Sequence, residues 1–179
     1  KTKSVVVGSL WQSGFYSARM TAKKNGVTYD GAISFVVKAS QPGSTSQILW
    51  VVPTNTYQAY NAWGGSSLYW TSLPNSMYVT DTVSFDRPWG ESWTDSGFAG
   101  YHLSDSLGQF DERENAWTQW IESHGYIVEY CADYDIDQNP QNFLSNYKMV
   151  IIPGHSEYWS QSMRDNIEAY IHPQPLGQY

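Results

Sequence analysis

The first forty positions largely alternate between polar and apolar residues, with the two-residue period of β-strands. The alternation runs through residues 14–39, and Asn25-Gly26 in its middle favours the tight turn of a β-hairpin. An apolar run at residues 4–8 predicts a further short strand. Residues 1–40 are therefore predicted to be a β-strand segment, the end of a β-sandwich-like region.

A linker rich in Pro, Gly and Ser at residues 40–47 separates this segment from a continuous apolar run at residues 48–53. Such a run predicts a strand buried on both faces, as in a parallel sheet. Residues 54–110 are rich in Gly, Ser, Asn and aromatic residues and are predicted to be irregular. A loop of that length inside a compact domain is usually functional.

Regular patterns return after residue 110. Asp111 and Glu114 have the spacing of a capping box, and Gly125 supplies a stop, so we expect a helix between them. The apolar residues on one face of this helix are Ala116, Trp117, Trp120 and Ile121.

Two more strands and a helix complete the pattern. Residues 126–130 and 147–153 are predicted strands, and the last helix stops before Pro173. Its apolar positions follow the spacing i, i+4, i+7, i+8: Met163, Ile167, Tyr170 and Ile171. Buried strands with intervening helices predict an α/β fold, with a layered parallel-sheet core over residues 48–171.

The two ends of the chain carry little pattern. Residues 172–179 are predicted to be an irregular tail, consistent with truncation of the chain. The first residues lack an initiator Met and the apolar core of a signal peptide, so we expect a processed product or a fragment.

Composition narrows the classes of partner. The net charge is −7 and no Lys/Arg cluster is present, which argues against nucleic acid. No apolar run approaches the ~18 residues of a membrane span. Cys131 is the only cysteine, so an internal disulfide is impossible and a buried structural role is expected. The many Ser, Thr, Asn and Trp residues with low charge favour export over the cytoplasm on composition alone.

The stretch PGHSEYW, residues 153–159, places three reactive side chains between a strand and a helix. It does not match G-x-S-x-G, and Ser156 is poorly placed to use the adjacent His155 as its base. His155 and Glu157 point the same way if the backbone is extended, a spacing that suits a metal site. The alternative is a capped helix start with Glu157 in its first turn.

Both this turn and the loop after residue 53 leave the carboxyl ends of predicted strands. Ligands of open α/β sheets gather at that edge, so we expect the two segments to face the same crevice. The loop carries phenols at Tyr57, Tyr60 and Tyr69. Tyrosinate is a hard anionic ligand that suits ferric iron, as does the Glu157 carboxylate.

Other candidate sites are weaker. DYDIDQN, residues 133–139, lacks the Gly and the carboxylate of a calcium loop, since Gln138 and Leu144 occupy those positions. It is predicted to be an acidic loop at a strand end. Three histidines are isolated in sequence and receive no role: His102, His124 and His172.

Four phrases occur together in order: PTNTYQAYNAWGGSSLY, VSFDRPWG, W…WIESHGYIVEYCADYDID and VIIPGHSEYWSQSMRDNIEAYI. In this combination the chain resembles the N,N-dimethylformamidase large (beta) subunit family. With the upstream SGFYSARMTA…ISFVV, the resemblance covers residues 10–171. Any one phrase alone would be a weak signal.

The resemblance implies an α/β core like that of class I glutamine amidotransferase-like domains, with hydrolysis of N,N-dimethylformamide to dimethylamine and formate. It also implies a mononuclear ferric iron held by two Tyr and one Glu, with a His nearby. Glu157 and Tyr60 match two ligands, and His155 matches the catalytic His. The second Tyr is Tyr69, or else Trp89 stands in its place and the iron site is disabled.

The leading hypothesis is therefore an iron-dependent hydrolase of small amide C–N bonds, with a homo-oligomeric or small-subunit partner. The alternative is a non-catalytic, amidotransferase-like binding module whose aromatic loop binds a small molecule or carbohydrate. A serine or cysteine hydrolase ranks last.

Overall fold

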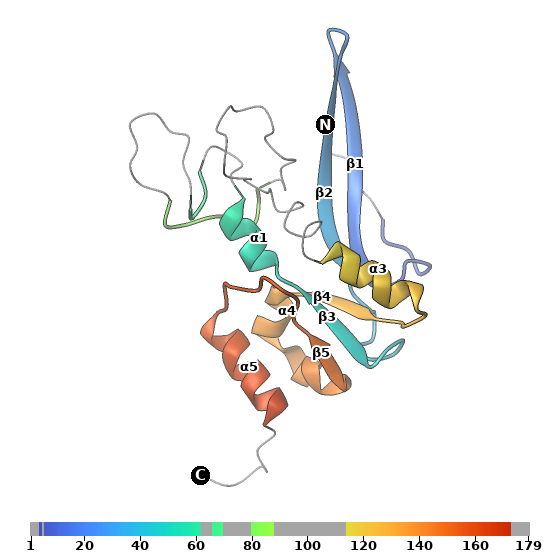
Figure 1. Ribbon diagram of the computed structural model, residues 1–179, viewed down its shortest axis with the longest axis vertical. Coiled ribbons are helices and arrows are strands. Elements are labelled where there is room, and N and C mark those ends of the chain that lie inside the picture. Colours follow the sequence, from blue (N-terminus) through green and yellow to red (C-terminus); the bar gives the residue numbers. More distant parts are fainter. Residues whose placement is uncertain (1–3, 5, 62–65, 70–79, 88–113, 173–179) are drawn as a thin grey trace.

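The computed structural model describes residues 4, 6–61, 66–69, 80–87 and 114–172. None of the helices in these ranges is long and apolar enough to cross a membrane. The elements in chain order (Figure 1) are β1 (Gly14–Lys24), β2 (Val27–Val37), β3 (Ile48–Val52), α1 (Thr54–Tyr60), α3 (Asn115–Ser123), β4 (Glu129–Ala132), α4 (Asp133–Gln138), the 3-10 helix η1 (Pro140–Asn146), β5 (Met149–Ile151) and α5 (Gln161–Ile171).

The predicted β-hairpin is confirmed. β1 and β2 pair antiparallel, and the hairpin extends as a long arm from the rest of the molecule (Figure 1). Asn25 and Gly26 both have positive φ, 52° and 79°, as the two-residue hairpin turn requires. The short strand predicted at residues 4–8 is wrong, since the described residues there form no strand and Val6 is 85% exposed.

A parallel sheet in the order β4-β3-β5 forms the core. The expected buried strand is β3, which lies in the middle with Leu49 to Val52 at most 2% exposed. The fold is thus mixed α/β with a small parallel sheet, as predicted.

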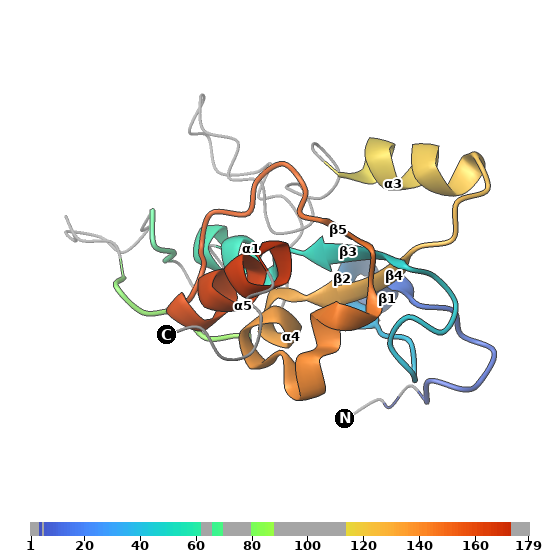
Figure 2. The same ribbon diagram turned by 90° about the horizontal axis from the view of Figure 1, so that it is seen from below.

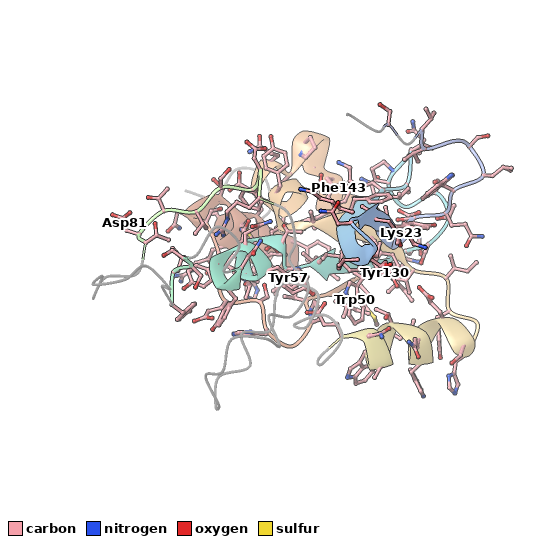
Figure 3. All side chains as sticks on the ribbon, turned by 90° about the horizontal axis from the view of Figure 1, so that it is seen from above. Lys23, Trp50, Tyr57, Asp81, Tyr130 and Phe143 are labelled. Atoms are coloured by element: carbon pink, nitrogen blue, oxygen red, sulfur yellow. The ribbon has the colours of Figure 1, made fainter. Side chains whose placement is uncertain are left out.

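Two apolar clusters cover the two faces of this sheet, because successive side chains of β3 point to opposite sides. Leu49 and Val51 join the cluster beneath α4, η1 and α5, and Cys131 is buried there as predicted. Trp50 and Val52 join the cluster on the α3 side. Figure 2 shows α3 on one side of the sheet and α4 and α5 on the other, and Figure 3 labels Trp50 of β3 on the side where α3 lies.

The predicted linker at residues 40–47 is fastened to the core. The buried Glu129 carboxylate accepts hydrogen bonds from Gly43 N (2.9 Å), Thr45 N (2.8 Å), Thr45 Oγ1 (2.7 Å) and Ser46 N (3.1 Å). Tyr147 Oη donates a fifth at 2.7 Å. One carboxylate therefore ties the β-segment connection to the start of β4.

The helix α3 differs from its prediction in start and orientation. It begins at Asn115, and Glu114 stands at the cap position without a side-chain capping bond. The predicted partner Asp111 lies outside the described residues. The apolar face was right only for Ile121, which is buried: Trp117 and Trp120 are 60% and 50% exposed, and Thr118 is buried instead. The Gly125 stop is confirmed by its φ of 81°.

Four segments were assigned the wrong structure or limits, among them the strand expected at 147–153, which covers only Met149–Ile151. The strand expected at 126–130 begins only at Glu129, and Ile127 is 65% exposed. The acidic loop at 133–139 is helix α4, whose Asp135 carboxylate accepts a hydrogen bond from Ala132 N (3.0 Å). The irregular region after residue 53 opens with helix α1, whose residues 54–60 include neither Gly nor Pro to interrupt it.

Candidate active site

Two segments that leave carboxyl ends of strands carry the candidate residues. α1 follows β3 directly, and Tyr60 is its last residue. Residues 152–160 follow β5 as an extended turn, and α5 begins only at Gln161, capped by the Ser160 side chain. Glu157 therefore lies outside the first turn of α5, so the helix-start alternative is wrong.

The two segments meet, as predicted from the sheet edge. Thr56 Oγ1 in α1 accepts hydrogen bonds from the main-chain N–H groups of Glu157 (2.9 Å) and Tyr158 (3.2 Å). Asn55 Nδ2 donates to the Tyr158 carbonyl at 3.1 Å. A third segment joins through Leu68 N, which donates to the Ala59 carbonyl (3.0 Å).

Three of the four sequence-predicted residues converge on the carboxylate of the fourth, Glu157. Tyr60 Oη donates to Glu157 Oε2 at 2.9 Å, and Tyr69 Oη donates to Oε1 at 2.8 Å. His155 Nε2 lies 3.0 Å from Glu157 Oε2 and 3.4 Å from Tyr60 Oη. Residues almost one hundred positions apart thus form one polar cluster, which we call the Glu157 cluster: Tyr60, Tyr69, His155 and Glu157.

Aromatic contacts hold the rings of this cluster. The Tyr60 and Tyr69 rings stack with centroids 4.3 Å apart, and the His155 ring meets Tyr60 edge-on at 5.1 Å. Tyr158 Oη donates to Tyr69 Oη at 2.6 Å, with its ring edge-on to that of Tyr69. Sequence reasoning missed Tyr158 although it adjoins Glu157.

The electrostatics favour a carboxylate that accepts from neutral phenols. Desolvation opposes ionisation of Glu157, but hydrogen bonds from Tyr69 and Tyr60 and the charge of His155 outweigh it and hold the Glu157 pKa below its ordinary value. Desolvation is also the main cause that raises the pKa of Tyr60 and of Tyr69. Both phenols therefore keep their protons at neutral pH in the metal-free protein.

A family model described as N,N-dimethylformamidase beta subunit-like, C-terminal, matches residues 1–173. The chain belongs to this family. It is thus a dimethylformamidase-related subunit, which supports an amidase or hydrolase relationship at a coarse level. Among curated proteins, none matches the chain.

Two of the four side chains in the Glu157 cluster, those of Tyr60 and Tyr69, are phenols. The described part of the chain contains no group of three or more His, Cys, Asp and Glu residues that could hold a metal ion. Two phenols, one carboxylate and one imidazole nevertheless converge, and oxygen donors of this kind suit a hard cation.

Arg87 fastens the segments that carry the two tyrosines. Its guanidinium donates to the carbonyls of Gln58 (2.6 Å), Asn61 (2.8 Å) and Ser66 (3.1 Å). The last carbonyls of a helix favour a nearby cation. The end of α1 with Tyr60 is thereby joined to the segment with Tyr69. The sequence pattern had assigned no role to Arg87, although it lies within VSFDRPWG.

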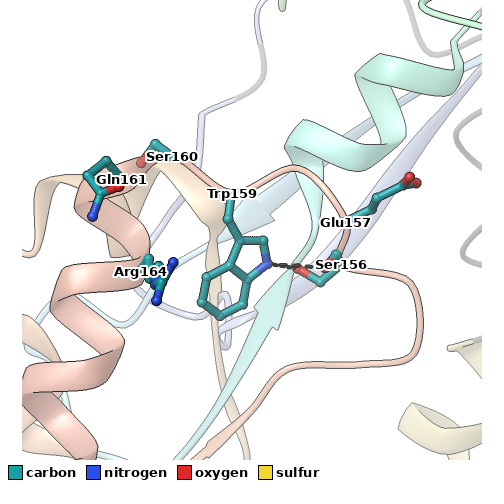
Figure 4. A pocket seen from close by; sticks show the side chains of 6 residues that line it. All are labelled: Ser156, Glu157, Trp159, Ser160, Gln161 and Arg164. Atoms are coloured by element: carbon teal, nitrogen blue, oxygen red, sulfur yellow. Dashed lines mark hydrogen bonds between the residues drawn. The ribbon is translucent and has the colours of Figure 1, made fainter.

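A shallow hollow lies beside the same turn, lined by Ser156, Glu157, Trp159, Ser160, Gln161 and Arg164 (Figure 4). The Glu157 side chain points away from Trp159 and Arg164. Ser156 Oγ accepts a hydrogen bond from Trp159 Nε1 at 2.8 Å. This arrangement gives no support to Ser156 as a nucleophile, because its oxygen faces an indole donor.

The remaining candidates lie elsewhere. Trp89 and His102 are outside the described residues. His124 ends α3, where its Nδ1 lies 2.8 Å from the Trp120 carbonyl, and His172 ends α5. Tyr57, the third phenol of the loop, is buried, and desolvation followed by the charge of Glu114 raises its pKa.

Proposed function

We propose that this chain is an iron-dependent hydrolase of small amide C–N bonds, of the N,N-dimethylformamidase type. The observation that carries the proposal is the convergence of Tyr60, Tyr69 and His155 on Glu157 in a member of that family. Family membership alone supports only the coarser relationship; the geometry of these four side chains supports the specific one.

The side chains fit ferric iron chemically. Phenolate and carboxylate oxygens are hard anionic ligands, and both phenol oxygens lie within 2.9 Å of the same carboxylate. In the metal-free protein, two phenol protons occupy the space between these oxygens. If Tyr60, Tyr69 and Glu157 held the cation, the two phenols would lose these protons to solvent. Tyr60, Tyr69 and Glu157 are the proposed ligands.

Bound iron supplies Lewis acidity toward the amide carbonyl and toward water. His155 is the residue placed to move protons, because its Nε2 lies 3.0 Å from Glu157 Oε2 and 3.4 Å from Tyr60 Oη. It accepts a proton from the attacking water as the C–O bond forms. It returns that proton to the amine nitrogen as the C–N bond breaks, which leaves dimethylamine and formic acid from N,N-dimethylformamide. The acid then loses its remaining acidic proton to solvent and becomes formate. Glu157, 3.0 Å from the imidazole, stabilises its protonated form.

The proposal extends to partners and fold relationship. The family description names a beta subunit-like protein, which supports a multi-subunit enzyme with a small-subunit partner. The order β4-β3-β5 with helices on both faces supports the class I glutamine amidotransferase-like relationship. In such sheets, the site lies at the carboxyl ends of the strands.

The test is metal analysis and an absorption spectrum after reconstitution with iron, with release of dimethylamine as the activity. Wild type should bind iron, show a visible tyrosinate charge-transfer band and hydrolyse the amide. Glu157→Gln should lose all three. Glu168→Gln, an exposed glutamate of α5 paired with Arg164, is the matched control and should lose none.

A colourless, iron-free wild type overturns the proposal. If that protein still binds a small amide or a carbohydrate, the non-catalytic binding module is supported instead.

A further inference from the structure

The peptide between Glu157 and Tyr158 is held from both sides by the first turn of α1. Thr56 Oγ1 accepts from both N–H groups, at 2.9 and 3.2 Å, and Asn55 Nδ2 donates to the Tyr158 carbonyl at 3.1 Å. These three main-chain groups lie in a turn without regular secondary structure. No ladder of a helix or sheet supplies their hydrogen bonds, and the side chains of Thr56 and Asn55 do so instead.

Helix geometry links this clamp to the Glu157 cluster. Thr56 and Tyr60 are four residues apart, so they lie on the same face of α1. Thr56 binds the main chain of Glu157, and Tyr60 binds its carboxylate. One helical face thus contacts this glutamate twice, which fixes both its backbone and its side chain.

Burial makes the clamp costly to break. Thr56 is 0% exposed, so loss of its hydroxyl removes the acceptor of two N–H groups and leaves a buried apolar side chain facing them. Asn55 is itself anchored, since its N–H donates to Asp133 Oδ2 at 2.9 Å. Asp133 is also 0% exposed and follows the central sheet directly at the end of β4. The clamp is therefore tied to the rigid core.

We propose that Thr56 and Asn55 are positioning residues that hold the Glu157–Tyr158 peptide so that the Glu157 carboxylate receives Tyr60 and Tyr69. The positioning is a property of the metal-free protein. Its consequence, a preorganised iron site, rests on the function proposed above.

The test uses a readout that loss of stability alone does not move. Hydrogen bonds from Tyr69 and Tyr60 hold the pKa of Glu157 below its ordinary value, and NMR titration of a labelled Glu157 carboxyl carbon measures that pKa without iron. Thr56→Val should raise the Glu157 pKa, because the carboxylate no longer meets its donors. Thr56→Ser should restore the wild-type value, because it keeps the accepting oxygen.

Thr118→Val is the matched control. Thr118 is also a buried helical threonine, but its hydroxyl bonds the Asn115 carbonyl in α3, remote in the chain from the turn. It should leave the Glu157 pKa unchanged. Should Thr56→Val not fold, Asn55→Ala decides, because Asn55 is only half-buried and supplies the other side of the clamp.

A folded Thr56→Val or Asn55→Ala protein with a wild-type Glu157 pKa overturns the positioning role. When the metal-free proteins are titrated with iron, the affinity of the same variants for iron should be roughly 10–100-fold lower than that of wild type. If wild type binds no iron but the pKa shift occurs, the positioning stands and the proposed function fails.

Discussion

Glu129 and Glu157 are two carboxylates that accept hydrogen bonds from tyrosines, but they lie at opposite ends of the strands of the parallel sheet. Glu129 is 0% exposed at the start of β4 and accepts from four donors in residues 43–46 besides Tyr147. The Glu157 side chain is 43% exposed beyond the end of β5 and accepts from Tyr60 and Tyr69, beside His155.

The difference lies in what kind of group supplies the hydrogen bonds. Three of the Glu129 donors are main-chain N–H groups, which cannot ionise or leave. Both phenols and the imidazole around Glu157 can lose or gain a proton. Glu129 is therefore a structural anchor, whereas Glu157 is surrounded by side chains that can themselves lose or gain protons.

A third carboxylate shows that burial alone does not decide ionisation. Asp133 is 0% exposed like Glu129, but Asn55 N is its hydrogen-bond donor and Oδ1 has none. Desolvation raises the pKa of Asp133 to about 7, although the bond from Asn55 opposes it. The pKa of Glu129 is instead lowered, because the bonds from Thr45, Tyr147 and Gly43 outweigh its desolvation.

The largest expected effect is on Glu129. Glu129→Ala should lower the free energy of unfolding by about 5 kcal/mol, since several buried donors lose a charged acceptor. Glu157→Ala should change it by less than about 1 kcal/mol, because that side chain is exposed. Urea unfolding near pH 7 measures both. Equal losses in the two variants would remove the distinction between anchor and site.

The pH dependence has a defined sign for Glu129. Its folded pKa lies below the ordinary value, so its stabilising contribution is present above the ordinary glutamic-acid pKa. The contribution is lost as the pH falls through the folded pKa. The stability gap between wild type and Glu129→Ala should narrow in that acid range.

Asp133→Asn should act in the opposite direction. The folded pKa of Asp133, about 7, exceeds its ordinary value of 3.8, so ionisation costs stability progressively as the pH rises between these values. The asparagine variant avoids that cost and should be more stable than wild type by about 2–4 kcal/mol above pH 7. Near pH 4 the two should differ little. The free energy of unfolding of both proteins, measured from pH 4 to 8, tests this prediction. A difference between the two proteins that stays constant over this pH range would contradict it.

Removing one tyrosine hydroxyl from each carboxylate should affect stability at Glu129 and the carboxylate pKa at Glu157. Tyr147→Phe removes one buried hydrogen bond to a charged group and should cost about 2 kcal/mol. Tyr69→Phe should cost less than about 0.5 kcal/mol, because Tyr69 is 46% exposed, but it should raise the pKa of Glu157. Thermal unfolding and NMR titration give the two results. A wild-type Glu157 pKa in Tyr69→Phe would show that this bond does not form in solution.

Sequence patterns could predict the parts of this fold that have a strong local signal. Asn25-Gly26 permits few conformations besides a hairpin turn, and residues 48–53 are apolar enough to require burial. The orientation of α3 was not predictable, because Trp117 and Trp120 outweigh Thr118 in hydrophobicity yet face solvent. Tertiary packing, which a single helix pattern does not contain, selected the buried face.

For the candidate site, the local spacing of His155 and Glu157 indicated their shared direction. Their meeting with Tyr60 depended on the rule that strand ends share a sheet edge, and the structure bears it out. Thr56 and Arg87 could not be found in this way. Their hydroxyl and guanidinium act on main-chain groups, so no side-chain pattern marks their targets.

The smallest expected effect on stability belongs to Tyr158, whose hydroxyl contacts the Glu157 cluster through Tyr69. Tyr158→Phe removes the donor to Tyr69 Oη and should change the free energy of unfolding by less than about 0.5 kcal/mol. In iron-loaded protein, the Tyr69 oxygen would lose a hydrogen bond that stabilises its negative charge, so less energy would be needed to transfer an electron from it to iron. The visible band should therefore move to longer wavelength. An unmoved band would mean that Tyr69 is not a ligand, since Tyr158 contacts the cluster through that oxygen.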